Sequence, residues 1–122
     1  MFDTTFEDLL ELRPELQQKY RAFLESVNHT DRISPEVLKA CQDRVRQVHG
    51  LEPDGKNDPR SREERAALVV AEKMPFQHHL LEDEEVQQVK ALFGDGGCVA
   101  FLTAIAFFDA SCRLELTFKG AH

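Results

Sequence analysis

The sequence predicts an all-α fold of about six helices in a single domain that spans residues 1–122. Apolar residues recur at spacings of three and four along most of the chain, which is the period of an amphipathic helix. Helix-capping residues, prolines and glycines separate these segments at short intervals. The alternating pattern typical of strands does not occur, and the sequence contains no internal repeat or low-complexity segment.

The first two predicted helices form a helical arm. Phe6, Leu9 and Leu10 indicate a short helix that stops before Pro14. Pro14 suits the first turn of a second helix, because its missing N–H costs nothing there. The apolar residues of this second helix recur at helical spacing: Leu16, Tyr20, Phe23, Leu24 and Val27.

Ser34 and Pro35 predict the start of a third helix, as an N-cap followed by proline at the first helical position. One stripe of this helix is apolar: Val37, Leu38, Cys41, Val45 and Val48. The helix is expected to end near Gly50. Residues 51–60 contain two prolines, one glycine and almost nothing apolar, which predicts an exposed loop.

Ser61 and Glu64 form a capping box that predicts the start of a fourth helix. Its inward positions are mostly alanine and valine, which permit close helix packing, and Pro75 ends it. After a connector, Asp83 begins a fifth helix. Gly94 is a natural C-cap for that helix and Asp95 a plausible start for the next one.

The last predicted helix, over residues 97–118, is the segment around which the chain must be organised. From Cys98 to Phe108 only Thr103 is polar, so we expect protein to surround this helix on all sides. A membrane span needs about twenty apolar residues, whereas Asp109 interrupts this run. We therefore predict a core helix and no membrane partner.

Charge and cysteine content exclude several classes of protein. The net charge of −7 and the pI near 5.2 argue against a nucleic-acid-binding surface. The opening residues are acidic and lack the apolar run of a signal peptide, which predicts a cytoplasmic location. The three cysteines, Cys41, Cys98 and Cys112, show no paired spacing, so we predict buried free thiols and no disulfide.

Two charges inside the last helix are candidates for a polar contact or a binding site. Asp109 and Arg113 are four residues apart, so they can pair with each other, or each can reach a partner on a neighbouring helix. A charged group beside apolar surface is usually paired with a group of opposite charge, because an unpaired buried charge is costly. The alternative is that these groups line a pocket.

Three further residues are candidates for acid–base chemistry. His49 is expected near a helix C-terminus, where a histidine commonly caps the helix. Glu64 is either the capping partner of Ser61 or a carboxylate that reaches His49 or Arg113 across a shared pocket. His79 follows His78 in the connector, but adjacent residues point in different directions. No metal-ligand spacing occurs, so neither a metal nor a cofactor is predicted.

Several segments together resemble the carboxymuconolactone decarboxylase family, whose members share the alkylhydroperoxidase D-like (AhpD-like) fold. They are EERAALVVAEKM at 63–74, DEEVQQVKALFGDGGCVAFLTAIAFFDASCR at 83–113, RVRQVHGLE at 44–52, and Pro14 to Leu16 with Phe23. The resemblance covers most of the chain in order and spacing. It implies an AhpD-like helical domain that assembles into dimers, trimers or hexamers.

The sequence departs from this family at its redox centre. The redox branch carries a glutamate, a Cys-x-x-Cys pair and a histidine, which activate and resolve a thiol that attacks peroxide. The same register places Lys39, Leu51, Asp54 and Asp58 at these four positions. We therefore do not expect the family's alkylhydroperoxidase, a peroxiredoxin-like activity, from this centre.

Three functional hypotheses follow. The first is a non-redox, oligomeric binding or scaffold protein, with a pocket for a small apolar or lactone-like ligand lined from Phe101, Phe107 and Phe108. The second is a decarboxylase or isomerase that uses His49, His79 or a glutamate as acid and base. The third is a residual thiol peroxidase that works through Cys41 or Cys112. The sequence does not identify the ligand.

Overall fold

The computed structural model describes residues 6–28, 33–51 and 61–120, and the secondary structure of these residues is entirely helical. The elements are α1 (Phe6–Leu10), α2 (Pro14–Asn28), α3 (Pro35–Val48), α4 (Arg62–Lys73), the short 3₁₀ helix η1 (His78–Leu80) and α5 (Asp83–Gly120). The predicted all-α class is confirmed. Most of the predicted loop at 51–60 lies outside the described residues.

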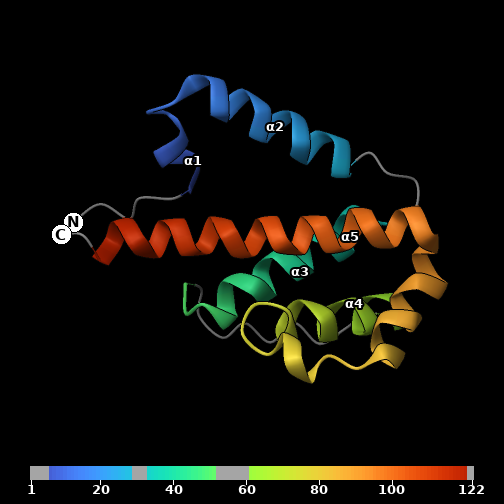
Figure 1. Ribbon diagram of the computed structural model, residues 1–122. Coiled ribbons are helices and arrows are strands. Elements are labelled where there is room, and N and C mark those ends of the chain that lie inside the picture. Colours follow the sequence, from blue (N-terminus) through green and yellow to red (C-terminus); the bar gives the residue numbers. More distant parts are fainter. Residues whose placement is uncertain (1–5, 29–32, 52–60, 121–122) are drawn as a thin grey trace.

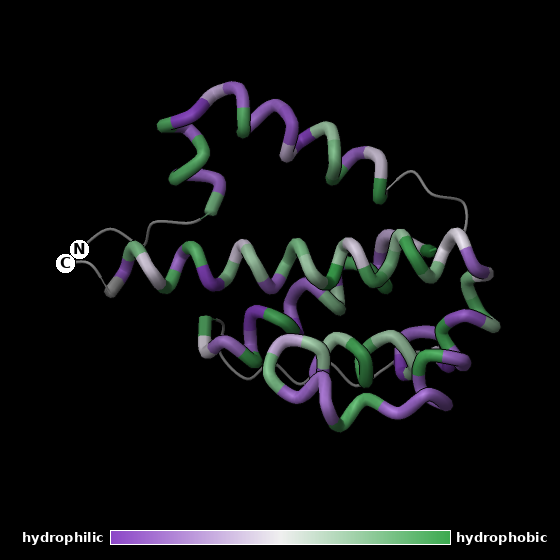
Figure 2. The backbone as a smooth tube through the Cα atoms, viewed as in Figure 1, coloured by the Kyte–Doolittle hydropathy of each residue, from purple (hydrophilic) through white to green (hydrophobic). Residues whose placement is uncertain are grey.

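The long helix α5 is the axis of the molecule (Figure 1). The arm formed by α1 and α2 lies along one side of α5, and α3 and α4 lie on the other. Hydrophobic residues run along much of α5, whereas α2 carries long hydrophilic stretches (Figure 2). The segment that the sequence marks as central is therefore the one that every other α-helix contacts.

A break at Gly94 divides α5 into two helices that meet at an angle. The backbone of Gly94 has φ 76° and ψ 172°, a conformation open almost only to glycine. The predicted boundary at Gly94 is thus confirmed. The first part of α5 turns toward α4, and the second part runs between the two sides of the molecule (Figure 1).

The main core lies where α3, α4 and α5 meet. Small side chains on α4 allow the helices to approach closely, as the sequence predicts. The fully buried residues of this core come from all three helices: Cys41, Val45, Ala67, Val70, Ala71, Val89, Phe101, Ala104 and Ile105.

Local sequence explains where these helices begin and end. The hydroxyl oxygens of Ser34 and Ser61 accept hydrogen bonds from the backbone N–H groups of Val37 (3.2 Å) and Glu64 (3.1 Å), so both predicted N-caps are confirmed. Gly50, two residues after the end of α3, has φ 75°, and the N–H of Leu51 donates to the carbonyl of Arg46. This is the usual way in which glycine ends a helix.

Helix α5 is not surrounded by protein on all sides, contrary to the sequence-based expectation. Val99 is 66% exposed and Phe118 is 45% exposed, and Leu114 and Leu116 are also partly open to solvent. The two sides of the molecule flank α5 but leave stripes of it between them uncovered. By length and composition alone, α5 could cross a membrane, a test that the core helix of a soluble protein also passes.

Candidate functional site

A cleft of about 350 Å³ lies between the arm and α5. Its lining is almost wholly apolar and comes from three helices: Phe6 and Leu10 of α1, Leu16, Lys19, Tyr20 and Phe23 of α2, and Phe107 and Leu114 of α5. The residues from α2 follow the apolar stripe of that helix, so the amphipathic pattern of the arm directs them toward α5.

Phe107 is the centre of an aromatic cluster in this cleft. Its ring stacks on Phe23 at 4.7 Å and on Tyr20 at 5.1 Å between centroids. The ring of Phe6 meets both Tyr20, at 4.9 Å, and Phe107, at 6.1 Å, edge to face. Both arrangements are favourable for aromatic quadrupoles, and these ring contacts help to hold the arm against α5.

Polar groups border the aromatic cluster. Lys19 is the one ionisable cation among the described lining residues. Burial raises the pKa of the Tyr20 phenol, and the negative charges of Glu7 and Glu115 act in the same direction. The Tyr20 phenol, which is a hydrogen-bond donor near neutral pH, therefore keeps its proton to higher pH than an exposed tyrosine does.

A buried carboxylate joins three helices beside this cleft. Glu115 of α5 is only 2% exposed and accepts a hydrogen bond from the backbone N–H of Phe6 at 2.6 Å. The guanidinium of Arg46, from α3, donates to both carboxylate oxygens at 3.1 and 3.3 Å. Pairing and hydrogen bonds together offset the cost of burying this charge.

A second polar cluster fixes the end of α3 to α5. The side chain of His49 is 1% exposed, and its Nε2 lies 2.7 Å from Oδ1 of Asp109. Asp109 also accepts from Nε of Arg113 at 3.1 and 3.2 Å, so the predicted ion pair within the helix is confirmed. Arg113 further donates to the carbonyl of Pro75 at 2.9 Å, which connects this cluster to the connector after α4.

The ring of Phe76 covers this cluster. It lies 4.7 Å from the imidazole of His49, and the guanidinium of Arg113 lies 4.9 Å from its centroid. A histidine hydrogen-bonded to a carboxylate is a pairing used in acid–base catalysis. Here the imidazole is enclosed, which favours a structural role in holding α3, α5 and the connector together.

The remaining predicted catalytic residues come from other elements. Glu64 is a buried residue in the first turn of α4, where its backbone N–H completes the Ser61 cap. His79 is exposed on η1, with its ring 5.9 Å from that of His78. Within the described part of the chain, no group of three histidine, cysteine, aspartate or glutamate side chains could hold a metal ion.

All three cysteines are buried thiols outside any disulfide, as the sequence predicts. Burial raises the pKa of the Cys41 thiol to about 12, with a contribution from the negative charge of Glu64, and burial also raises the pKa of Cys98. A protonated, enclosed thiol is a poor nucleophile. This environment gives no support to peroxide reduction by Cys41.

The positions of the family's redox centre are not assembled into a reactive group among the residues described. Lys39 pairs with Asp43 at 3.0 Å on the surface of α3, and Leu51 is half-buried after that helix. Asp54 and Asp58 lie outside the described residues.

The three phenylalanines proposed as pocket residues separate into two groups. Phe107 lines the cleft, whereas Phe101 and Phe108 are buried in the core, where Phe101 packs 5.6 Å from Phe93. Helical periodicity explains the difference, because positions 101 and 108 share one face of α5 and position 107 does not.

Sequence reasoning missed Glu115, Arg46 and the part that Tyr20 and Phe6 take in the cleft. A signal for Glu115 was present, since it continues the buried stripe of Phe101, Phe108 and Cys112 by one further turn. An acidic residue on a core face needs a buried partner.

Comparison of the chain with models of known protein families, with curated proteins and with solved structures finds no match. The resemblance to the AhpD-like family therefore stays a prediction from the residues alone.

Proposed function

We propose that this protein is a non-redox, oligomeric binding protein whose ligand site is the aromatic cleft between the arm and α5. The observation that carries this proposal is the cluster of Phe6, Tyr20, Phe23 and Phe107 around an apolar cleft of about 350 Å³. Ligand sites in proteins are typically concave, mainly apolar and furnished with few polar groups, and this volume is at the small end of their usual range.

The chemistry of the lining favours a small apolar or lactone-like ligand. Aromatic faces accommodate a flat or cyclic apolar body. The hydroxyl of Tyr20 and the ammonium group of Lys19 are the polar groups at hand, and both can donate to a carbonyl oxygen.

Self-association is the second part of this proposal. The exposed apolar side chains of α5, Val99 and Phe118 foremost, are the kind of surface that a second copy would cover. This part rests on a different surface from the cleft, so the two parts can fail separately.

The single tyrosine gives a direct test of the cleft. The chain has one tyrosine and no tryptophan, so its intrinsic fluorescence reports on Tyr20 alone. Titration with a neutral lactone such as γ-nonalactone should change this emission in a saturable way. Phe107→Leu should weaken binding by roughly tenfold, because it removes the stacking surface at the centre of the cleft.

Phe118→Leu is the matched control for ligand binding, because it makes the same change at an exposed phenylalanine of the same helix outside the cleft. Since Phe118 also lies on the surface proposed for self-association, sedimentation of both variants checks that they assemble alike. Circular dichroism of both variants checks that they fold. An emission that does not respond to neutral apolar ligands, or equal weakening by the two variants, would contradict the proposal.

The acid–base enzyme remains a second candidate because of one observation, the 2.7 Å contact between His49 and Asp109. It predicts turnover of a lactone substrate with a bell-shaped pH profile, abolished by His49→Gln. Binding without turnover would favour the first proposal.

A further inference from the structure

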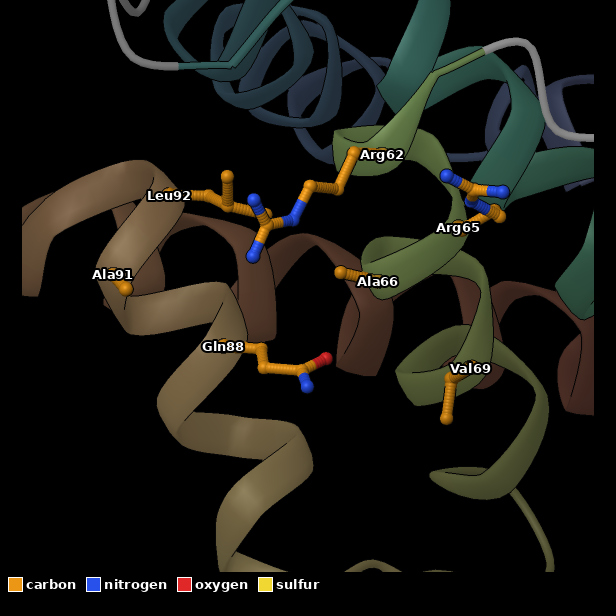
Figure 3. A pocket seen from close by; sticks show the side chains of 7 residues that line it. All are labelled: Arg62, Arg65, Ala66, Val69, Gln88, Ala91 and Leu92. Carbon is orange, nitrogen blue, oxygen red and sulfur yellow. The ribbon is translucent and has the colours of Figure 1, made fainter.

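A second cleft, of about 460 Å³, lies between α4 and the first part of α5 (Figure 3). The α4 side is formed by residues at positions 62, 66 and 69, which share one helix face, and the α5 side by positions 88, 91 and 92. Its floor is apolar, with Ala66, Val69 and Leu92 among its members. This cleft is on the other side of the molecule from the arm, so it is independent of the aromatic cleft.

Two polar side chains reach into this cleft from opposite walls. Figure 3 shows the guanidinium of Arg62 extending from α4 toward Leu92, and the amide of Gln88 pointing from α5 toward α4. The guanidinium group of Arg65, also at the rim, is directed away from Gln88 in this view. The cleft thus combines a cation, an amide donor and an apolar floor.

Within residues 6–28, 33–51 and 61–120, no hydrogen bond or ion pair engages the side chain of Arg62 or Gln88. Other cations near the helix junctions are engaged by carboxylates: Arg44 with Glu72, Arg46 with Glu115, Lys73 with Glu85 and Arg113 with Asp109. Arg62 and Arg65 thus line this cleft as two exposed cations without such a partner among the described residues, in a chain of net charge −7.

We infer that this cleft binds a small organic carboxylate with an apolar body. The planar guanidinium of Arg62 matches a carboxylate in a two-pronged contact, and the amide of Gln88 can donate a further hydrogen bond to the same group. The apolar body then lies on Ala66, Val69 and Leu92. Charge complementarity selects this occupant over a neutral one.

The test uses the full-length protein and a matched pair of probes, octanoate and 1-octanol. Isothermal titration calorimetry gives the affinities, and ¹⁵N NMR gives the site, because the side chains of Arg62 and Gln88 both carry observable N–H groups. Octanoate should bind more tightly than octanol and should shift the Arg62 Nε–H and Gln88 amide resonances.

Arg62→Gln should weaken octanoate binding by about fivefold to tenfold and leave octanol binding unchanged, as the loss of a charge-assisted hydrogen bond requires. Arg13→Gln is the control, because it makes the same change in net charge at an exposed arginine on the turn between α1 and α2. Gln88→Ala should give a smaller loss in the same direction.

Four outcomes would overturn the inference. The first three are equal binding of octanoate and octanol, equal weakening by Arg62→Gln and Arg13→Gln, and octanoate-induced shifts confined to Tyr20 and its neighbours. Dissociation of an oligomer by Arg62→Gln without a loss of octanoate affinity would instead identify an acidic surface of a second copy as the occupant, and would equally overturn it. None of these results depends on whether the aromatic cleft binds a lactone.

Discussion

The two sides of α5 are built by different physical means. Along its second part, after Gly94, α5 meets small, fully buried side chains and the Arg46–Glu115 ion pair on the side of α3 and α4. Toward the arm it meets large aromatic rings that stack but leave a cleft. Close packing confers stability and a unique structure, whereas a gap between rings offers a site for a ligand at some cost in stability. Along the second part of α5, the comparison assigns stability to the side of α3 and ligand binding to the side of the arm; the carboxylate cleft inferred above lies on the first part of α5.

The largest expected loss of stability is for a substitution on the core side, where α5 packs on α3 and α4. Phe101→Ala should lower the free energy of unfolding by about 3–5 kcal/mol, because it removes a fully buried ring and leaves a cavity. Phe107→Ala, in the half-buried cleft, should cost only about 1–2 kcal/mol. Denaturant unfolding of both variants measures the difference. Equal losses would show that the two sides contribute alike.

A substitution at the break in α5 should have the next largest effect on stability. Gly94→Ala should lower the free energy of unfolding by about 1–3 kcal/mol, because alanine is strained at the backbone angles of Gly94. Gly96→Ala is the matched control, since nothing lies within 4 Å of an added Cβ there. It should be neutral or stabilising by about 0.5–1 kcal/mol, as expected for alanine over glycine in a helix. If Gly94→Ala left the free energy of unfolding unchanged, the fold would not need glycine at this break.

Alkaline pH should also lower the free energy of unfolding. The group responsible on the core side, Cys41, should act at lower pH than Tyr20 on the arm. The pKa of Cys41 is raised to about 12 from its usual value near 9, so the folded state holds the thiol proton more tightly than the unfolded state. The stability from this group is fully present below about pH 9 and is lost as pH rises from there through 12. Tyr20, whose pKa is raised from 10, adds a loss that begins above pH 10.

Cys41→Ala should therefore reduce the fall in unfolding free energy between pH 9 and 10, relative to the unmodified chain. Unfolding curves at each pH test this, with Cys98→Ala as a comparison.

The thiols of the native protein should also be unreactive. At one pH, organic hydroperoxide should oxidise them no faster than free cysteine, since all three are buried. Rapid loss of one thiol per chain would revive the peroxidase hypothesis.

The smallest effect on the stability of a single chain is expected for a substitution at an exposed apolar position of α5. Val99→Glu places a charge at an exposed position and should change the unfolding free energy of one chain by less than about 0.5 kcal/mol. If a second copy covers α5 there, the same change should reduce the apparent mass in sedimentation. A protein that is monomeric at micromolar concentration before the substitution would refute self-association.

Local chemistry made much of the fold predictable. Ser34, Ser61, Gly50 and Gly94 each act at one helix end, so their roles follow from the neighbouring sequence. The pair of Asp109 and Arg113 was likewise predictable, because four residues separate its members on one helix.

The candidate sites were less predictable because their partners are distant in the chain. The cleft needs Phe6, Tyr20 and Phe107 at once, and no local pattern indicates which faces of the three helices will meet. His49 could be placed at a helix end, but its contact with Asp109 depends on how α3 crosses α5. Helical periodicity alone could have separated Phe107 from Phe101 and Phe108.

The hydrogen bond from the N–H of Phe6 to Glu115 connects positions 109 residues apart, nearly the whole length of the chain. Closing so long a loop carries a large entropic cost, so we expect α1 to dock late in folding and to open first in the native state. Hydrogen exchange should then release the amides of α1 before those of α3 or α5. Because Phe6 and Leu10 form one wall of the aromatic cleft, the same opening would set the rate at which a ligand enters and leaves.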